Sequence, residues 1–335
     1  MNTAVVILNW NGQKMLERFL PSVIANTEAD IIVADNGSTD NSVAFMQECY
    51  PSIPLILLDK NYGFAEGYNR ALSQLPHKYF LLLNNDVECT PNWLTNMERM
   101  MDKYPDVAII QPKIRMFDDR ERFEYAGAAG GFIDKYGYPF CRGRLFNHIE
   151  KDNGQYDDEC EIFWATGAAM MVRADVWRKL SGFDSDFFAH MEEIDFCWRA
   201  KNSGCKVMYC PNSVVVHVGG GTLPKSSPFK AQLNFRNNLA MLYKNLPQKR
   251  LHRVIALRML LDGVAALKFL LEGHPKESQA VAKAHRAFRK MKPSLKEKRK
   301  KIVQIEVSRM YKGLLLFEHY LLRRTTFSAL PKKFS

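Results

Sequence analysis

Three carboxylates, Glu192, Glu193 and Asp195, stand within four consecutive residues of the chain. Large apolar residues flank them, in FDSDFF on one side and FCW on the other. Acids in partly apolar surroundings have raised pKa values, which suits a general base. Two structural interpretations stay open: acids in a first helical turn complement the helix dipole, and these acids could pair with His190 or Arg199.

A second set of residues could hold a hard divalent cation. Asn84, Asn85 and Asp86 follow a run of three leucines, and His217 ends the apolar run of VVVHVGGGT. One carboxylate suffices for Mg²⁺ or Mn²⁺ where the phosphates of a substrate supply further ligands, and imidazole suits Mn²⁺ better than Mg²⁺. The alternatives are a strand-terminating turn and a core histidine. The stretch GGGTLPKS nearly matches a phosphate-binding P-loop, but Pro224 replaces its second glycine, so we exclude that match.

Alternating strand and helix signals in the first hundred residues position these side chains. Apolar runs predict buried strands at 4–8, 31–34, 55–58 and 79–83, and helical spacing predicts helices at 13–25, from about 40 to 50 and at 65–75. This alternation indicates βαβ units around a parallel sheet, whose ligands bind at the carboxyl ends of the strands. Asp35 lies at such an end, where it could contact a ribose or base, although an Asx turn would have the same sequence.

The remainder of the chain divides into three parts. Residues 112–160 are irregular, and their aromatic residues favour a structured, variable binding loop (Phe132, Tyr136, Tyr138 and Phe140). Regular structure returns at 161–218, with an apolar segment at 168–172, helices from 174 and through 192–202, and a strand at 213–218. From about 229 the pattern predicts almost only helix, bounded by Pro247, Pro275 and Pro293.

Composition excludes several classes of protein. The 335 residues are 47% hydrophobic and 25% charged, which excludes disordered, collagen-like and low-complexity chains. No apolar run approaches the roughly 18 residues of a membrane span, and no basic segment precedes the first apolar run, so we expect neither a transmembrane helix nor a signal peptide. Seven cysteines without a CxxC pair predict reduced thiols and a cytoplasmic protein.

The charge is unevenly distributed. Residues 1–240 hold 24 Lys and Arg against 30 Asp and Glu, whereas residues 241–335 hold 23 against 6. Such a basic region predicts a polyanionic partner, either a membrane surface or a nucleic acid. It carries no RNA-binding aromatic motif or zinc-finger spacing, so we favour an anionic membrane surface and no nucleic acid. The helix expected at 251–271 is amphipathic, and we expect it to pack on the rest of the protein.

Eight segments, in order and covering about 1–245, resemble glycosyltransferase family 2, the inverting nucleotide-sugar enzymes of the type A fold. They are VVILNWNG, VADNGSTDNS, NYGFAEGYNRAL, LLLNNDVE, ATGAAMMVRADVWRKLSGFD, MEEIDFCWRAKNSGCKV, VVVHVGGGT and RNNLAMLYKNLP. The resemblance is closest to bacterial rhamnosyltransferase-like members.

The resemblance implies donor-binding roles. Asn9 and Asp35 would hold the nucleoside, while Asn61, Gly63 and Asn69 would lie against the diphosphate-sugar.

It also implies a metal site within the donor-binding segment 84–86. Asp86 matches the metal-binding last position of the family's DxD signature, with Asn85 before it, and Asn84 stands where many relatives have Asp. His217 matches a histidine that ligates metal or diphosphate in several relatives.

For the catalytic helix, members often have Glu-Asp-x-Asp, so Glu193 matches the base that deprotonates the acceptor hydroxyl. Glu192 remains a rival, and Asp195 completes the motif. A single base on the face opposite the departing diphosphate gives inversion, and a cation neutralises the charge on the departing oxygens.

The implied architecture is α/β: a Rossmann-like nucleotide-sugar-binding domain of the type A glycosyltransferase fold at 1–228, with a mostly parallel central sheet and a variable acceptor-side loop region at 112–160. A basic helical C-terminal region follows at 229–335. The implied activity is inverting transfer of rhamnose or a hexose from a dTDP- or UDP-sugar to a saccharide or lipid-linked acceptor in cell-surface polysaccharide biosynthesis. The expected location is the cytoplasm, on the inner face of the cytoplasmic membrane. Two alternatives are a sugar-nucleotide-binding protein without turnover and a nucleic-acid-binding protein.

Overall fold

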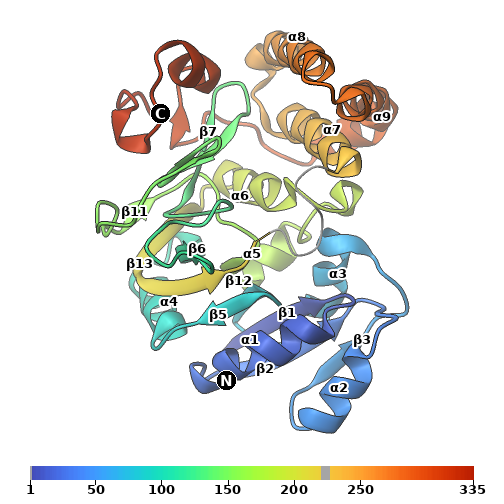
Figure 1. Ribbon diagram of the computed structural model, residues 1–335, viewed down its shortest axis with the longest axis vertical. Helices are drawn as coiled ribbons and strands as arrows, with labels where there is room; N and C mark the ends of the chain where they lie inside the picture. The colour runs from blue at the N-terminus through green and yellow to red at the C-terminus, as the bar shows by residue number, and fades with distance from the viewer. Residues whose placement is uncertain (1, 220–226) are drawn as a thin grey trace.

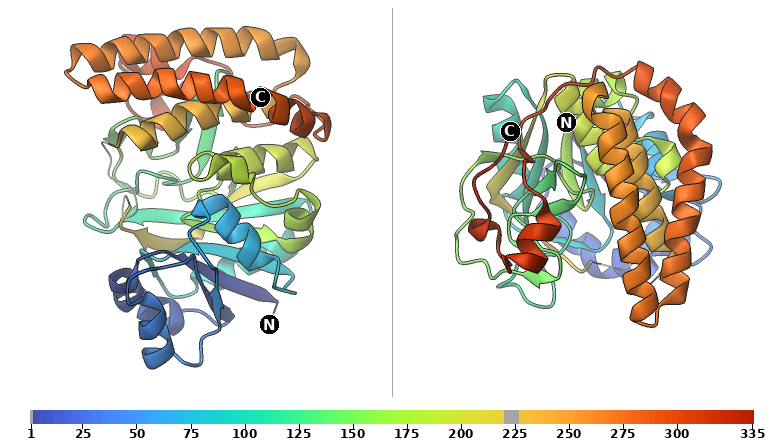
Figure 2. Two further views of the ribbon diagram at one scale, coloured as in Figure 1. Left: turned by 90° about the vertical axis from the view of Figure 1, so that its right-hand side faces the viewer. Right: turned by 90° about the horizontal axis from the view of Figure 1, so that it is seen from above.

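The computed structural model of the chain describes residues 2–219 and 227–335. A nine-stranded sheet at the centre of the described residues has the order β11-β13-β6-β12-β4-β1-β2-β3, with β5 paired to β13 (Figure 1). A smaller sheet and a stack of C-terminal helices lie beyond the β11–β13 end (Figures 1 and 2). The rejected P-loop match at 219–226 lies outside the described residues except for Gly219.

The first four strands form the predicted parallel part of the central sheet. They are β1 (Thr3–Asn9), β2 (Asp30–Asp35), β3 (Leu55–Leu57) and β4 (Tyr79–Asn84), and α1 (Gln13–Ala25), α2 (Ser42–Cys49) and α3 (Gly63–Leu72) connect them. Every expected element of this part is confirmed to within about three residues at each end. The strands are apolar on both faces because helices and further chain cover each side, and two hydrophobic clusters fill the space above and below the sheet.

Beyond β4 the sheet becomes mixed. Its remaining elements are β5 (Val87–Cys89), α4 (Trp93–Lys103), β6 (Val107–Met116), β11 (Cys160–Glu161), β12 (Ala169–Arg173), α5 (Ala174–Lys179), α6 (Glu192–Asn202) and β13 (Lys206–His217). Strand β12 runs antiparallel to both β4 and β6, whereas β13 is parallel to β6. Strand β13 begins seven residues before the predicted strand because a bulge between Cys210 and Val214 accommodates Pro211 and Asn212, which the sequence pattern treats as a break.

The segment at 112–160 is ordered and forms most of the smaller sheet. Its strands β7 (Gly131–Asp134), β8 (Pro139–Cys141), β9 (Arg144–Leu145) and β10 (His148–Ile149) are joined by β14 (Met310–Tyr311) from the C-terminal segment. The rings of Phe132 and Phe140 are buried and pack against Phe327. Tyr136 and Tyr138 are half-buried. The interpretation of these aromatic residues as a binding surface is therefore wrong for the two phenylalanines, because they hold the C-terminal segment in place.

Three helices follow: α7 (Pro228–Asn245), α8 (Gln248–Leu271) and α9 (Pro275–Lys300). They stack above α6, with α8 outermost (Figure 2). Pro247 and Pro275 mark helix starts as predicted, but Pro293 lies inside α9. The exposed Pro293 interrupts the hydrogen-bond ladder without ending the helix, and the buried Leu295 anchors the next turn. Residues 301–335 are mostly irregular, so the prediction of almost continuous helix fails after Lys300.

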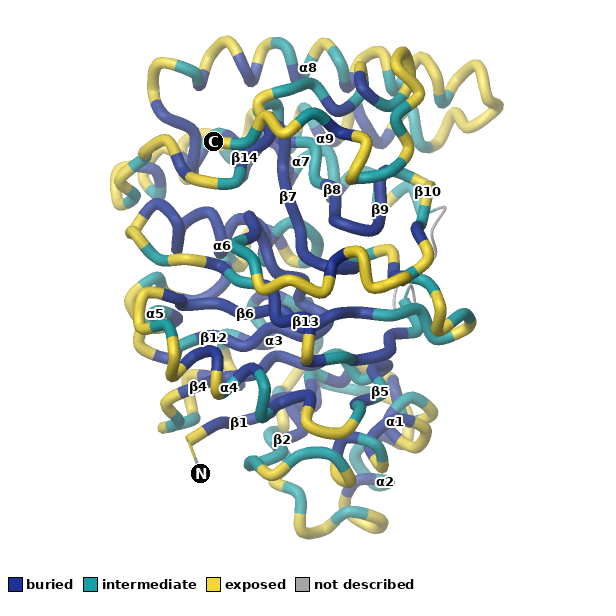
Figure 3. Tube along the Cα trace, turned by 90° about the vertical axis from the view of Figure 1, so that its left-hand side faces the viewer, coloured by how far each residue is buried: buried dark blue, intermediate teal, exposed yellow. Residues whose placement is uncertain are grey.

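Helix α8 packs differently from the expectation. Leu251, Val254 and Ile255 are buried in its first half, but its second half exposes apolar side chains along its outer edge (Figure 3). Only the inner face of the helix contacts the rest of the protein. The helical periodicity of the apolar residues did not show that those of the second half would be exposed. Among the described residues, no helix is both long and apolar enough to cross a membrane. All seven cysteines lie in the described part of the chain as free thiols.

Candidate active site

The carboxyl ends of β1, β2 and β4 meet at one edge of the central sheet. The parallel register pairs Asn9 with Asp35 and Leu8 with Asn84. Asn9 Nδ2 donates to Asp35 Oδ2 (3.1 Å), and Asn85 Nδ2 donates to Asn9 Oδ1 (2.9 Å). The structure therefore brings the two residues expected at the nucleoside together with Asn85.

The start of α3 lies beside this edge. Asn61 Oδ1 accepts from the backbone N–H of Gly63 (2.8 Å). Gly63 has a φ of +75°, and a Cβ there would collide with the ring of Phe188, so the position requires glycine. Farther along α3, the amide of Asn69 donates to the carbonyl of Phe183 (2.8 Å) and accepts from its N–H (2.9 Å). Asn69 thus ties α3 to the segment that leads into α6.

Asp86 and His217 come together although they are far apart in the sequence. Strand β5 pairs with β13 and sets His217 opposite Val87, the neighbour of Asp86. Asp86 Oδ1 accepts from His217 Nε2 (3.1 Å), and Asn84 Nδ2 lies 3.3 Å from the same nitrogen. On the other side of the ring, Glu124 Oε1 lies 3.7 Å from His217 Nδ1. Burial disfavours the imidazolium, but the two carboxylates outweigh burial and raise the pKa of His217 to about 10.

Once a cation displaces the proton of His217, the donor atoms of this pair fit a divalent cation that also binds a diphosphate. The carboxylate of Asp86 and the imidazole of His217 are both almost fully buried and face one another. Glu124 beside the far ring nitrogen is the outer partner that metal-bound histidines usually have. The described residues contain no group of three or more His, Cys, Asp or Glu side chains that could hold a metal. A cation here would therefore depend on phosphate oxygens for its other ligands.

The start of α6 presents two glutamates with perturbed pKa values. Glu192 is buried, Glu193 is half-buried, and one carboxylate oxygen of each has no hydrogen-bond partner among the described residues. Burial raises the pKa of Glu193 to about 7, against a smaller opposing effect of backbone N–H groups. Burial and the neighbouring charge of Glu193 raise the pKa of Glu192 well above its ordinary value. Glu193 therefore combines an unpartnered carboxylate oxygen with proton affinity suited to a base at neutral pH.

The turn before α6 has a strained backbone. Phe188, His190 and Met191 have φ values of +65°, +69° and +73°. Non-glycine residues rarely adopt such values, and each costs about 1–3 kcal/mol unless its surroundings enforce the conformation. Burial lowers the pKa of His190 to about 4, so its imidazole is neutral at neutral pH. The strained segment before α6 therefore sets the direction in which α6 and its two glutamates begin.

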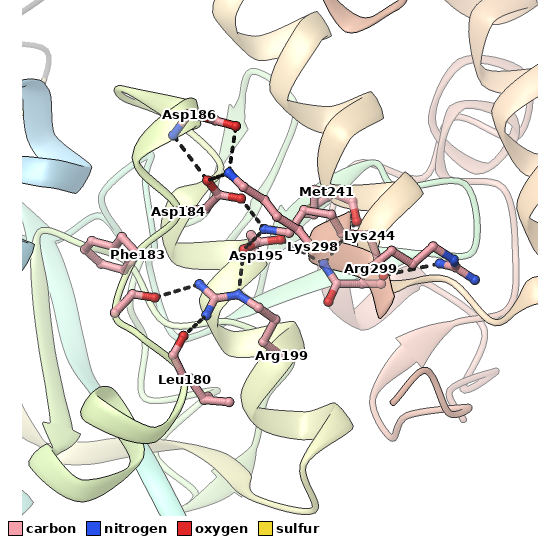
Figure 4. A network of polar contacts seen from close by, with 12 residues as sticks. Leu180, Phe183, Asp184, Asp186, Asp195, Arg199, Met241, Lys244, Lys298 and Arg299 are labelled. Atoms are coloured by element: carbon pink, nitrogen blue, oxygen red, sulfur yellow. Dashed lines mark hydrogen bonds and ion pairs between the residues drawn. The ribbon is translucent and has the colours of Figure 1, made fainter. Parts of the chain in front are cut away.

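Asp195 lies in a network of ion pairs rather than at an open surface (Figure 4). Its Oδ2 accepts from Arg199 Nε and Lys244 Nζ (2.8 Å each), and its Oδ1 accepts from Asn245 Nδ2 (2.8 Å). Both oxygens are thus occupied, which favours the structural interpretation of this acid. Lys244 also donates to Asp184 (2.6 Å).

This network joins the two regions expected from the sequence. Lys244 comes from α7, and Lys298 of α9 pairs with Asp184 and Asp186 (Figure 4). The expected boundary between residues 228 and 229 therefore separates α6 from the helices that neutralise its buried acid. Neither Glu124 nor Lys244 was predicted, because Glu124 lies in an irregular segment and no sequence motif marks Lys244 as a partner of Asp195.

The family model described as "Glycosyl transferase family 2" matches residues 4–180. The chain is 26% identical over 233 residues to an N-acetylglucosaminyl-diphospho-decaprenol L-rhamnosyltransferase of Mycobacterium tuberculosis, covering 64% of this chain and 75% of that protein. It is 23% identical to the rhamnosyltransferase WbbL of Escherichia coli, covering 64% of this chain and 82% of WbbL.

A third relative and two solved structures extend the comparison. The hexosyltransferase Agl10 of low-salt glycan biosynthesis in Haloferax volcanii is 23% identical, covering 80% of this chain and 85% of Agl10. S. aureus TarS 1–349 with UDP-GlcNAc has a TM-score of 0.55 and 16% identity, covering 90% and 88%. GalNAc-T7 with UDP, GalNAc and Mn²⁺ has a TM-score of 0.60 and 15% identity, covering 74% and 48%. These two structures support the type A glycosyltransferase fold.

The family model matches more than half of the chain, in the part that holds the strand-end residues from Asn9 to Asp86. The chain therefore belongs to glycosyl transferase family 2, and it is a glycosyltransferase similar to rhamnosyltransferases.

Proposed function

We propose that the protein transfers rhamnose or a hexose from a dTDP- or UDP-sugar to a saccharide or lipid-linked acceptor in cell-surface polysaccharide biosynthesis, with inversion at the anomeric carbon. The observation that carries the proposal is Glu193 at the start of α6, whose carboxylate has one oxygen without a partner among the described residues and a pKa raised to about 7. The segment before it contacts the donor side, because the carbonyl of Phe188 accepts from the N–H groups of Phe64 (2.9 Å) and Ala65 (3.2 Å) at the start of α3.

In the proposed reaction, Glu193 removes the proton of the acceptor hydroxyl as the acceptor oxygen bonds to the anomeric carbon. The bond from that carbon to the diphosphate oxygen breaks on the opposite face, so the configuration inverts. Asn9 and Asp35 would bind the nucleoside, with Asn61 and Gly63 beside the diphosphate. Burial and the charge of Glu193 raise the pKa of Glu192, which favours the protonated form of this neighbour of the base.

Asp86 and His217 would hold Mg²⁺ or Mn²⁺ in this reaction, with Asn84 and Asn85 beside them. The cation would neutralise charge on the departing diphosphate. GalNAc-T7 and the mannosyltransferase PcManGT were both solved with Mn²⁺, which supports a divalent metal in the proposed role.

The test is a transfer assay with dTDP-rhamnose, UDP-GlcNAc and UDP-glucose, each with a GlcNAc-diphospho-lipid acceptor and Mg²⁺ or Mn²⁺. Glu193→Gln should lower kcat by about 10²-fold or more while the Kd of the donor stays the same, because the amide keeps the shape but cannot accept the proton. Glu192→Gln is the matched control. If the control collapses and Glu193→Gln does not, the base is Glu192. Donor binding without any transfer to the acceptor would favour the alternative of a binding protein.

We also propose that the protein binds the inner face of the cytoplasmic membrane through α8. Leu260, Val264, Leu267 and Leu271, the α8 stripe, follow helical spacing and are 57–81% exposed. The opposite face of α8 is buried although it carries the ion pair of Arg258 and Asp262 (2.8 Å). From Arg258 onward, this helix therefore buries an ion pair while it exposes the α8 stripe to solvent, which is unusual for a surface helix.

Further apolar and basic groups adjoin the α8 stripe. Lys268 Nζ lies 5.8 Å from the ring centroid of Tyr320, which is exposed together with the neighbouring Leu321. Figure 2, seen from above, places this segment beside α8. Arg323 follows, and residues 241–335 carry 23 basic against 6 acidic residues. Apolar side chains flanked by positive charge complement an anionic bilayer surface, where each Lys or Arg contributes about 1 kcal/mol.

Vesicle flotation tests this surface. The wild type should float with vesicles that contain phosphatidylglycerol and not with pure phosphatidylcholine, and high salt should weaken binding. Leu267→Glu should abolish flotation, whereas Leu57→Glu should not. Both leucines are 57% exposed, but Leu57 lies on β3 at the opposite end of the molecule (Figure 1). Equal flotation of the two variants, or a concentration-dependent dimer that only Leu267→Glu disrupts, would refute the membrane proposal.

A further inference from the structure

One side chain of α7 reaches the strained turn that precedes α6. Asn237 is fully buried, and its Nδ2 donates to the backbone carbonyls of Phe187 (3.0 Å), Ala189 (2.9 Å) and His190 (2.7 Å). An amide nitrogen carries two N–H groups, so three carbonyls converge on two donors. These carbonyls belong to residues on both sides of Phe188 and next to Met191, where the backbone has positive φ.

The neighbouring residue fixes the orientation of this amide. Arg236 Nε donates to Asn237 Oδ1 (2.8 Å), so the amide oxygen faces the guanidinium and the nitrogen faces the turn. Arg236 Nη2 also donates to the carbonyls of Asp186 and Phe187 (3.0 Å each). Two adjacent residues of α7 thus satisfy four carbonyls over residues 186–190, all within a few residues of the glutamates of α6.

We propose that Asn237 is a positioning residue that holds the turn at 187–191 and thereby aims Glu193 at the acceptor hydroxyl. The inference rests on the proposed role of Glu193 as the base. Without the amide, the three non-glycine residues with positive φ would relax toward negative φ values, because the strained conformation would lose its hydrogen bonds. Helix α6 would then start in a different direction. A displacement of about 1 Å at a reacting group is enough to lower a rate by about 10²-fold.

The alternative is that Asn237 only packs α7 against the rest of the protein, and the chain supplies a matched control for it. Asn238 is the next residue of α7 and is equally buried, and its Nδ2 donates to one carbonyl, that of Gly137 (2.6 Å). Gly137 lies between β7 and β8, away from the turn. Asn237→Asp and Asn238→Asp each replace a buried donor with a carboxylate facing carbonyl oxygen. They differ in whether the carbonyls belong to the turn.

The experiment measures kcat, the Kd of dTDP-rhamnose and the thermal midpoint for both variants of the full chain, with a GlcNAc-diphospho-lipid acceptor. Each substitution is made in the wild type and in Glu193→Gln. In the wild type, Asn237→Asp should lower kcat at least about 10-fold more than Asn238→Asp, with the donor Kd within about twofold. In Glu193→Gln, where the base is absent, Asn237→Asp should cause little further loss, because residues that act through one another are not additive.

Three results would overturn the proposal: a wild-type kcat in folded Asn237→Asp, an equal loss of kcat in Asn238→Asp, or the same fold-loss with and without Glu193. If Asn237→Asp does not fold, Asn237→Ala removes the donors without adding a charge and is judged by the same comparisons. Failure of the proposed function is distinguishable, because Glu193→Gln alone would then keep its kcat whatever Asn237 does.

Discussion

Lys244→Met tests the ion-pair network that joins α6 to the C-terminal helices. The side chain of Lys244 is 2% exposed and lies between Asp184 and Asp195, which are 6% and 0% exposed. Methionine keeps most of the volume but leaves two buried carboxylates without this cation, and removing one member of a buried ion pair costs about 3–5 kcal/mol. An unfolding entropy of about 2.1 cal/mol/K per residue then predicts a fall in Tm of about 4–7 °C.

Lys298→Met is the control, and both variants are assayed by thermal unfolding at pH 7. Lys298 is 32% exposed and pairs with Asp184 and Asp186 but not with Asp195. A partly exposed pair contributes about 1 kcal/mol or less, so its Tm should fall by no more than about 2 °C. Equal losses in the two variants, or a loss below 2 °C for Lys244→Met, would refute the reasoning.

The Tm difference between wild type and Lys244→Met should also depend on pH, in a direction that the pKa of Asp184 determines. Burial alone would raise the pKa of Asp184, but Lys244 and Lys298 outweigh burial and lower it. A carboxyl with a lowered pKa in the folded state stabilises the protein above its unfolded pKa of about 3.9, and this contribution is lost as the pH falls toward the folded pKa. The Tm difference between wild type and Lys244→Met should therefore be full at pH 7 and shrink below about pH 4. A constant difference down to pH 3 would contradict the ion-pair account.

Three further predictions concern the site. The kcat of transfer should rise with pH through about 7, as Glu193 loses its proton, and a profile that is flat from pH 5 to 9 would contradict its role. Asp86→Ala should abolish transfer and remove the effect of Mn²⁺ on donor affinity measured by calorimetry; full transfer by chelator-treated wild type would contradict the metal site. Gly12→Ala should weaken donor binding about 10-fold or more, because its Cβ would collide with Asn85 and Asn9, and an unchanged Kd would show that this edge does not contact the donor.

The hydrophobic pattern of the sequence was sufficient to predict the helices and strands whose tertiary packing agrees with it. Helices α1 and α6 begin and end at the predicted residues, and β1 to β4 follow the predicted apolar runs. The prediction failed where a proline, which usually ends a strand or helix, lies within one. Pro211 lies in a bulged strand and Pro293 in a continuing helix, since long-range pairing with β6 and packing around Leu295 outweigh the local preference.

The site could be predicted as strand ends and one acidic helix, but the contacts between them could not. Asp86 and His217 were each expected at the end of a strand, yet only the antiparallel pairing of β5 with β13 makes them neighbours. Glu124 approaches His217 from a segment without periodicity, so no local signal marked it. The resemblance favoured Glu193 as the base, with Glu192 as a rival, but the sequence did not show the surroundings of the three acids. Their environments separate Asp195 from the two glutamates, because Asp195 is neutralised by two cations whereas Glu192 and Glu193 each retain an oxygen without a partner among the described residues.

Side chains of the segment RNNLAMLYKNLP, at the end of α7, contact both the turn before α6 and Asp195. Arg236 and Asn237 hold the turn before α6, while Lys244 and Asn245 hold Asp195 within it. Asn237 and Lys244 lie on one face of α7, about two turns apart, so one helix contacts both the turn before α6 and Asp195 within it. On the proposals above, both Glu193 and the α7 residues that would position it lie beyond the matched family model, which ends at residue 180. If the proposals hold, a variant truncated before α7 would lose the constraint on Glu193 even if the sheet edge from Asn9 to Asp86 still formed.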